Sequence, residues 1–224
     1  MDDVLMSAPL FAALDVEAAA ALKASMEERR LLKGDVLFAE GDPGDRLYVV
    51  TEGKIKLGHA SNDGRETLLA VMGEGEMFGE LSLFDPGPRT ATATALTDAI
   101  VLGLGHAALR PWLTGRPEVA ESLLQALAQR LRRTNEALSD LVFSDVPGRV
   151  AKALLDLGER FGQPMPDGLH VTHDMTQEEL AQLVGASRET VNKALADFAS
   201  RGWLRLEPRS VVIMDIERLR RRAR

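Results

Sequence analysis

The 224-residue chain has no cysteine, which excludes disulfides, thiolate zinc sites and cysteine-ligated iron–sulfur clusters. It also has no apolar run that approaches the roughly 18 residues of a membrane-spanning helix. Its amino terminus, with Asp2 and Asp3, lacks the basic region of a signal peptide. We therefore expect a cytoplasmic protein with no membrane segment and no redox sensing through sulfur.

Groups for catalysis are equally scarce. Of the four histidines, only His170 and His173 are close in sequence, and in an extended segment they would fall on opposite faces. The chain has no clustered His and Asp metal ligands and no nucleophile with a base beside it. We therefore expect a binding protein without a metal site rather than an enzyme.

The net charge of −7 is unevenly distributed. Residues 1–135 carry 14 Lys and Arg against 20 Asp and Glu, whereas residues 188–224 carry 10 against 5. A basic segment on an acidic protein is expected when only one surface meets phosphates. Five arginines lie between positions 218 and 224. They are interpreted either as a solvated helix end or as a direct DNA contact.

Residues 78–90 combine the groups needed to hold a phosphate and a sugar. The segment reads Phe78-Gly79-Glu80-Leu81-Ser82-Leu83-Phe84-Asp85-Pro86-Gly87-Pro88-Arg89-Thr90. Arg89 supplies a permanent, forked positive charge suited to a phosphate, and Ser82 and Thr90 offer hydroxyl donors. Glu80 is unsuited to a phosphate but accepts hydrogen bonds from the hydroxyls of a sugar. The pattern indicates a nucleotide.

This segment resembles the phosphate-binding cassette of cyclic-nucleotide-binding domains. The resemblance implies that Glu80 holds the ribose 2′-hydroxyl and that Arg89 and Thr90 hold the cyclic phosphate. It implies close backbone contacts at Gly79, Leu81 and Ser82. A threonine at position 90 also resembles that of cyclic-GMP-selective domains, so both nucleotides stay open at this residue.

Short apolar runs separated by glycine-rich turns extend from residue 31 to residue 104. The runs cover residues 36–38, 47–50, 55–57, 68–71 and 99–102. Regular short strands predict a β-barrel or β-roll, and the turns at 41–45 and 52–54 resemble those of the same nucleotide-binding domains. Before them, an Ala- and Leu-rich segment over 15–27, with Asp15 as N-cap, predicts a helix.

A long helix is predicted over residues 117–143, because Pro117 suits a first helical turn and neither glycine nor another proline interrupts the pattern. Its leucines alternate in steps of three and four residues, as in a coiled-coil seam. The seam consists of Leu124, Leu127, Leu131, Leu138 and Leu141. At ~1.5 Å per residue the helix is longer than one small domain needs. We therefore predict a homodimer joined along this seam.

Thr134 is the one polar residue at a seam position. It either sets the register of the paired helices or, by resemblance to regulators with such domains, contacts the adenine ring. The same resemblance implies that Asn135 reaches the nucleotide bound to the other subunit. Their hydroxyl and amide groups suit an adenine amino edge, which favours cyclic AMP as effector.

The sequence breaks at residues 143–149, which we interpret as a hinge. Ser144 or Asp145 can cap a new helix with Pro147 in its first turn. That helix is expected to reach about Phe161, before a loop over 162–168 and a strand over 169–172.

Residues 176–195 predict a helix-turn-helix. Thr176 and Glu179 match a capping box, Gly185 suits the turn, and Ser187 can cap the second helix. The start of the second helix is where base readers stand. The candidate base contacts are Arg188, Glu189 and Lys193, and the candidate phosphate contacts are Thr176, Ser187 and Thr190.

Runs over 203–206 and 211–213 then predict a β-hairpin that completes a winged helix. The predicted fold is α+β, with a jelly-roll-like, cyclic-nucleotide-binding β-roll over 1–116, a dimerisation helix and hinge over 117–144, and a winged helix-turn-helix over 145–224.

The whole chain resembles the cyclic-AMP receptor protein/fumarate–nitrate regulator superfamily, above all its actinobacterial cyclic-AMP receptor branch. The segments that carry the resemblance are 78–82, 85–90, 145–152 and 184–195. It implies a homodimeric transcription regulator that binds cyclic AMP and a palindromic DNA site with TGTGA half-sites. RNA polymerase is a further candidate partner. The alternative function is an architectural DNA-binding protein only weakly modulated by nucleotide.

Overall fold

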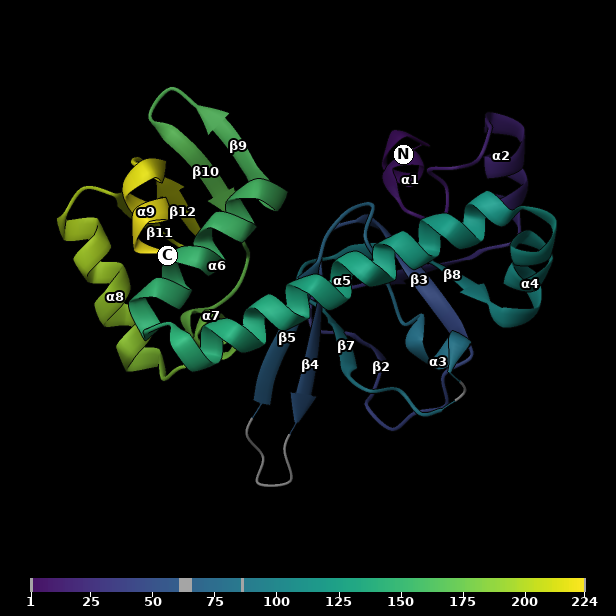
Figure 1. The fold of residues 1–224 in the computed structure, drawn as a ribbon, viewed down its shortest axis with the longest axis horizontal. Helices are drawn as coiled ribbons and strands as arrows, with labels where there is room; N and C mark the ends of the chain where they lie inside the picture. The colour runs from purple at the N-terminus through teal and green to yellow at the C-terminus, as the bar shows by residue number, and fades with distance from the viewer. Residues whose placement is uncertain (1, 61–65, 86, 224) are drawn as a thin grey trace. The chain divides into compact units, whose positions relative to one another are not determined.

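Two compact units make up the computed structural model, which describes residues 2–60, 66–85 and 87–223 (Figure 1). The first unit contains residues 1–60 and 69–133, and the second contains residues 61–68 and 134–224. Sheets and helices occur in both, which confirms the α+β class. No helix within the described ranges is both long and apolar enough to cross a membrane.

The first unit is built on two four-stranded sheets, as the predicted β-roll requires. One sheet has the strand order β1-β8-β3-β6 and the other β2-β7-β4-β5. The strands are β1 (Glu27–Leu31), β2 (Val36–Phe38), β3 (Arg46–Glu52), β4 (Ile55–Ala60), β5 (Glu66–Met72), β6 (Met77–Phe78), β7 (Thr92–Ala95) and β8 (Ala99–Gly105).

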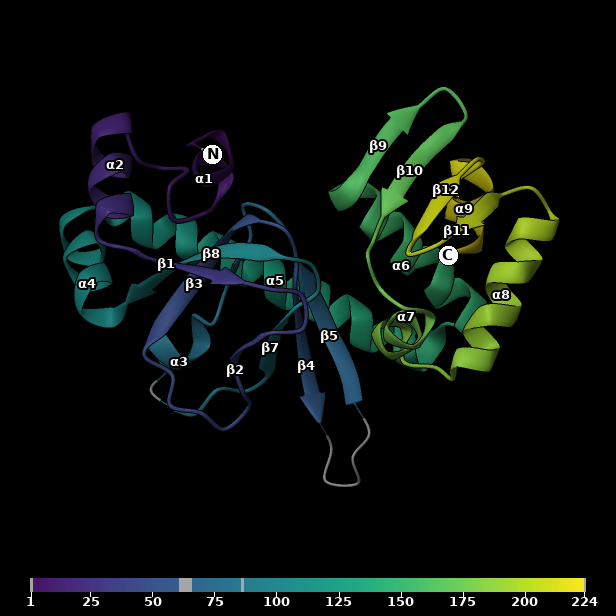
Figure 2. The same ribbon diagram turned by 180° about the vertical axis from the view of Figure 1, so that it is seen from behind.

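β3 is buried on both faces because it separates two apolar cores. Leu47 and Val49 belong to a core that also includes residues of α2 (Val16–Ala24) and α4 (His106–Gly115), whereas Tyr48 and Val50 belong to the core between the sheets. This division follows from the alternation of side chains along a strand. Figure 2 shows α2 and the short α1 (Asp2–Ser7) beside the sheet of β1, β8 and β3.

α5 (Pro117–Phe143) has the predicted bounds and carries both buried and exposed apolar residues. Val119 and Leu123 are buried in the core that α2 and α4 share. The leucines of the predicted seam are more exposed: Leu124, Leu131, Leu138 and Leu141 are 66%, 62%, 57% and 51% exposed, and Leu127, four residues after Leu123, is half-buried.

The second unit contains the predicted winged helix-turn-helix. Its elements are α6 (Val146–Phe161), β9 (Gly162–Met165), β10 (Gly168–Thr172), α7 (Gln177–Val184), α8 (Arg188–Ser200), β11 (Leu204–Glu207), β12 (Ser210–Ile213) and α9 (Ile216–Arg222). Asp145 caps α6, and Thr176 with Glu179 forms the capping box of α7. Gly185 ends α7 in a left-handed conformation, with φ of 68°. These local predictions are confirmed.

Two local predictions are wrong. The helix expected over 15–27 ends at Ala24, because residues 27–31 pair with β8 as strand β1. The loop expected over 162–168 begins with strand β9. β9 lies at the edge of the sheet β11-β12-β10-β9, where Pro164 is tolerated because an edge strand has one unpaired side.

Replacement of Gly53 by alanine should destabilise the first unit more than the same change at Gly34. Both glycines have positive φ, 76° and 93°, so both lose about 1–2 kcal/mol from left-handed backbone strain. A Cβ at Gly53 would also stand 2.2 Å from the carbonyl oxygen of Asp98, whereas the Cβ at Gly34 meets no described atom within 4 Å. We expect a total of about 2–5 kcal/mol for Gly53→Ala by urea unfolding. Equal losses at the two sites would contradict the close approach of Asp98 to the turn between β3 and β4.

Candidate nucleotide and DNA sites

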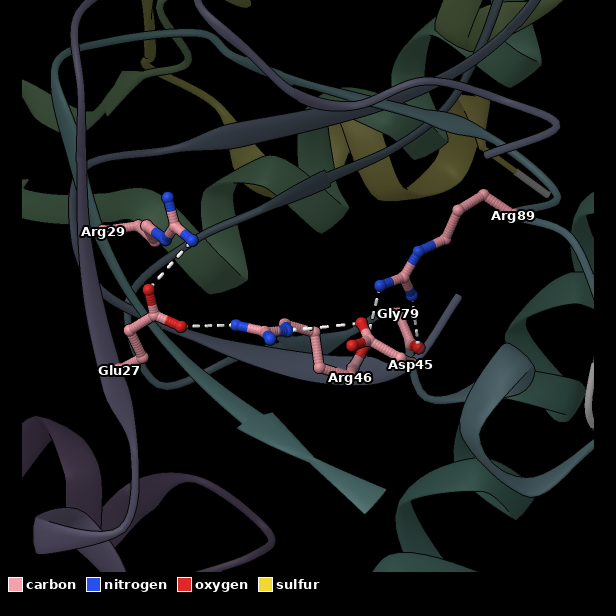
Figure 3. A network of polar contacts seen from close by, with 6 residues as sticks. All are labelled: Glu27, Arg29, Asp45, Arg46, Gly79 and Arg89. Carbon is pink, nitrogen blue, oxygen red and sulfur yellow. Dashed lines mark hydrogen bonds and ion pairs between the residues drawn. The ribbon is translucent and has the colours of Figure 1, made fainter. Parts of the chain in front are cut away.

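Arg89 is a buried cation held by backbone carbonyl groups. Its side chain is 4% exposed. Nη1 donates to the carbonyl oxygen of Gly79 at 2.8 Å, and Nη2 donates to that of Arg46 at 2.9 Å (Figure 3). Burial lowers the pKa of Arg89, and the nearby Tyr48 and Asp45 oppose this. The guanidinium nevertheless stays protonated, because arginine does not lose its proton in proteins.

Glu80 is a buried carboxylate with one satisfied oxygen. It is 1% exposed, and its Oε1 accepts a hydrogen bond from Nη1 of Arg130 at 2.8 Å. Its Oε2 has no hydrogen-bond partner among the described residues, and the same holds for Nε of Arg89. Buried polar atoms are rarely left unpaired in folded proteins. One acceptor and one donor of this site are therefore available to a ligand.

Two glycines in this site have no room for a side chain. A Cβ at Gly79 would lie 2.9 Å from Nη1 of Arg89, and one at Gly44 would lie 2.2 Å from Cβ of Ser82. Side chains at these positions would displace the groups expected to hold the phosphate.

The structure buries three of the predicted cassette residues, and a fourth, Gly79, accepts a hydrogen bond from Arg89. Glu80, Ser82 and Arg89 are all buried, and the Ser82 hydroxyl lies 3.5 Å from the carbonyl oxygen of Pro88. Leu81 begins α3 (Leu81–Phe84) and is 51% exposed, and Thr90 is also exposed. Pro86 of the motif lies outside the described residues.

Arg130 is a site residue that sequence reasoning missed. It lies on α5, 50 residues from Glu80 in the chain, so no local motif connects the two. Thr134 follows one helical turn later, and positions four residues apart share a helix face. Thr134 and Asn135 are exposed and belong to the second unit.

The predicted DNA-contacting residues lie at the start of α7 and in the first two turns of α8, with its N-cap. All six of them, Thr176, Ser187, Arg188, Glu189, Thr190 and Lys193, are exposed. The Ser187 hydroxyl caps α8 by accepting from the Thr190 N–H at 3.2 Å. Lys193 forms an ion pair with Glu189 at 2.7 Å, so these two charges partly neutralise each other.

Most cations of the basic carboxyl-terminal segment already have acidic partners. Arg201 pairs with Asp197, Arg205 with Asp167 and Glu207, Arg218 with Asp215, Arg220 with Glu217 and Arg222 with Asp145. Hydrogen bonds from Arg205 and His170 hold the pKa of Asp167 at about 2. These pairs favour the interpretation of the arginine-rich tail as a helix end.

Arg188 and Arg209 differ from these cations because they have no acidic partner among the described residues. Within the described part of the chain, neither guanidinium has a hydrogen-bond or ion-pair partner, and both are exposed. Arg188 begins α8, and Arg209 occupies the β11–β12 turn with φ of 57°. Sequence reasoning missed Arg209.

Arg149 connects the hinge to the helix-turn-helix by hydrogen bonds. Its Nη1 donates to the carbonyl oxygen of Ser144 at 2.7 Å, and Nε and Nη2 donate to those of Val184 and Gly185 at 3.0 and 3.2 Å. One side chain therefore connects the residue that follows α5 with the turn before α8. Its position in α6 gave no sequence signal for this role.

Comparison with known proteins accounts for both units. The model of the cyclic nucleotide-binding domain matches residues 28–114, and that of the Crp-like helix-turn-helix domain matches residues 148–222. A CRP-like cAMP-activated global transcriptional regulator of Mycobacterium tuberculosis is 58% identical over 224 residues, which is 100% of both chains.

The chain belongs to the CRP/FNR family. Among solved structures, the catabolite activator protein of Thermus thermophilus is 36% identical, with a TM-score of 0.56 over 96% of this chain and 98% of that one. The c-di-GMP-responsive global regulator CLP of Xanthomonas campestris is 29% identical, with a TM-score of 0.74 over 89% and 99%. Membership of the CRP/FNR family confirms the expectation of a regulator rather than an enzyme. Within the described residues, no group of three or more His, Cys, Asp or Glu side chains could hold a metal ion.

Removal of the Arg130 cation should destabilise the ligand-free protein. Arg130→Met leaves the buried Glu80 carboxylate without its cation, but Arg130 is 37% exposed and water offsets part of the loss. We therefore expect about 1–3 kcal/mol by urea unfolding. The double variant Arg130→Met/Glu80→Gln should regain much of this loss.

Arg133→Met is the matched control, because Arg133 is exposed on the same helix and should change stability by less than about 0.5 kcal/mol. Equal losses for the two arginines would contradict the role of the Arg130–Glu80 pair.

Proposed function

We propose that this chain is a homodimeric transcription regulator that binds cyclic AMP in the β-roll and reads a palindromic DNA site with TGTGA-type half-sites. The observation that carries the proposal is the pair of unpaired buried atoms, Oε2 of Glu80 and Nε of Arg89. A sugar hydroxyl supplies the missing donor and a phosphate oxygen the missing acceptor. The name of the 58% identical relative, a cAMP-activated regulator, supports the same ligand class.

In this proposal Glu80 binds the ribose 2′-hydroxyl, and Arg89 with Thr90 binds the cyclic phosphate. Gly79, Leu81 and Ser82 make the close backbone contacts. Thr134 and Asn135 contact the base, Asn135 from the second subunit. Cyclic AMP is favoured, although the c-di-GMP response named for the Xanthomonas relative means that the fold alone does not select the nucleotide.

The dimer forms along Leu124, Leu127, Leu131, Leu138 and Leu141. The exposure of four of these leucines in the isolated protomer supports this, because a contiguous apolar stripe on a helix is usually covered by a partner. The domains are proposed to cover 1–116, 117–144 and 145–224.

In the second unit, Arg188, Glu189 and Lys193 read base edges, while Thr176, Ser187 and Thr190 contact phosphates. The free guanidinium group of Arg188 supports its assignment to guanine, since no ion pair must be broken first. Arg209 in the wing is a further candidate phosphate contact. Such a regulator acts on DNA in the cytoplasm, and RNA polymerase is its expected protein partner.

Cyclic AMP binding should depend on Arg89. Arg89→Leu removes the charged phosphate donor from an enclosed site, which should weaken binding by about 2–5 kcal/mol in calorimetry. Arg110→Leu, which removes an exposed cation from the same unit, is the control. Glu80→Gln should weaken cyclic AMP more than 2′-deoxy cyclic AMP. An Arg89→Leu affinity within threefold of the unmodified protein would exclude the proposed pocket.

Charged residues placed in the leucine seam should disrupt the dimer. Leu131→Glu with Leu138→Glu places like charges across a two-fold axis, so the dimer should dissociate to monomers in sedimentation at micromolar concentration. Both leucines are exposed in the protomer, so its fold should persist. Gln129→Glu adds a charge to the same helix away from the seam and should leave the dimer intact. An unchanged dimer in the double variant would place the interface elsewhere.

DNA sequence discrimination should depend on Arg188. Arg188→Ala should weaken operator binding by about 1–3 kcal/mol and relax discrimination at one G·C pair, whereas Thr190→Ala should weaken all sequences alike. Operator and random-sequence affinities are measured at one salt concentration, with and without cyclic AMP. An operator-to-random affinity ratio that is unchanged in Arg188→Ala would mean that Arg188 contacts phosphates rather than a base. An operator-to-random affinity ratio that is the same with and without cyclic AMP would favour the architectural role.

A further inference from the structure

Three aromatic rings pack together beside Arg89, and two of them, Phe38 and Tyr48, lie under its guanidinium. The chain has only seven Phe, two Trp and one Tyr, yet Phe38, Tyr48 and Phe78 form one group. Their ring centroids are 5.8 Å apart for Phe38 and Tyr48, 5.6 Å for Tyr48 and Phe78, and 6.1 Å for Phe38 and Phe78. Phe38 comes from β2 and the other two from β3 and β6, so the group joins the two sheets of the first unit.

Of these rings, Phe38 lies nearer to the Arg89 cation than Tyr48 does. Cζ of Arg89 lies 4.2 Å from the Phe38 ring centroid and 5.8 Å from that of Tyr48. A cation at such distances over a ring face is attracted by the ring quadrupole, and the attraction grows when water is excluded. Burial raises the pKa of the Tyr48 phenol, and the nearby Arg89 charge opposes this shift.

The ring and the carbonyl groups restrict different motions of Arg89. The hydrogen bonds to Gly79 and Arg46 fix the positions of Nη1 and Nη2, but a guanidinium can still tilt about the line between them. A ring beneath the plane opposes that tilt. The plane of the guanidinium decides where its unpaired Nε–H points.

We propose that Phe38 is a positioning residue for the nucleotide phosphate, which acts by fixing the plane of the Arg89 guanidinium so that its free N–H groups face the ligand. This inference rests on the proposed function of Arg89. It adds a determinant of nucleotide affinity from β2, outside residues 78–90. Figure 3 shows how Arg89 reaches across to the Gly79 and Arg46 carbonyl groups. The Phe38 ring lies under the guanidinium, with 4.2 Å between its centroid and Cζ.

The test compares cyclic AMP affinities of ring-removing and ring-keeping variants by calorimetry. Phe38→Leu should weaken binding roughly fivefold to thirtyfold, and Phe38→Trp, which keeps a ring face, should stay within about threefold. Phe161→Leu is the matched control: it removes a ring that Arg160 contacts at 4.8 Å in the second unit, and it should leave affinity within twofold. Should Phe38→Leu fail to fold, Phe38→Met replaces it, because methionine fills irregular core space.

A double-variant cycle separates positioning from simple core packing. In an Arg89→Lys background, which keeps the charge but removes the planar fork, Phe38→Leu should change the affinity by less than about twofold, measured by the thermal shift at millimolar cyclic AMP. An equal loss in both backgrounds, or a Phe38→Leu affinity within twofold of the unmodified protein, would overturn the inference. If Arg89→Leu itself leaves binding unchanged, the proposed function fails instead.

Discussion

The first unit is organised around two buried ionic groups that do not neutralise each other. Removal of an ion from water costs several kcal/mol even after the protein relaxes. Arg89 is compensated by two carbonyl groups and a ring, and Glu80 by Arg130. Each compensation is incomplete, since one N–H and one carboxylate oxygen stay unpaired among the described residues. A ligand that brings both a hydroxyl and an anionic oxygen completes the site, and one that brings a single group leaves a buried polar atom unsatisfied.

The Glu80–Arg130 contact connects this site to the long helix. A hydroxyl that binds Glu80 shares the carboxylate with Arg130, and Arg130 belongs to the same α5 that carries the exposed leucines. A nucleotide can shift the state of the helix only by as much as its contacts differ between the two states. The Glu80–Arg130 ion pair is the contact through which the proposed nucleotide site touches α5.

Local signals in the sequence account for what could be predicted. Asp15, Asp145 and the Thr176–Glu179 capping box predict helix starts because a cap depends on residues three positions apart. Strand β1 was missed because its sequence, Glu27-Glu28-Arg29-Arg30-Leu31, has no apolar alternation and is set by pairing with β8. In the same way Glu80 and Arg89 lie within one motif, whereas Arg130 and Phe38 reach them only through the tertiary fold. Contacts between side chains that are far apart in the sequence leave no local motif from which a single sequence could predict them.

Charge pairing in the second unit explains how an acidic chain can present a DNA-binding face. The net charge of −7 counts arginines whose carboxylate partners lie within hydrogen-bond distance, such as Arg205 on Asp167 and Arg222 on Asp145. Those cations neutralise the protein's own acids, and they would have to exchange partners before they could contact a phosphate. Arg188 and Arg209 need no such exchange, because in the described residues their guanidinium groups are unpaired. Counterion release depends on the cations that meet phosphates rather than on the total charge. Arg188 on α8 and Arg209 in the wing are therefore the cations of this unit that could approach DNA without first breaking an ion pair.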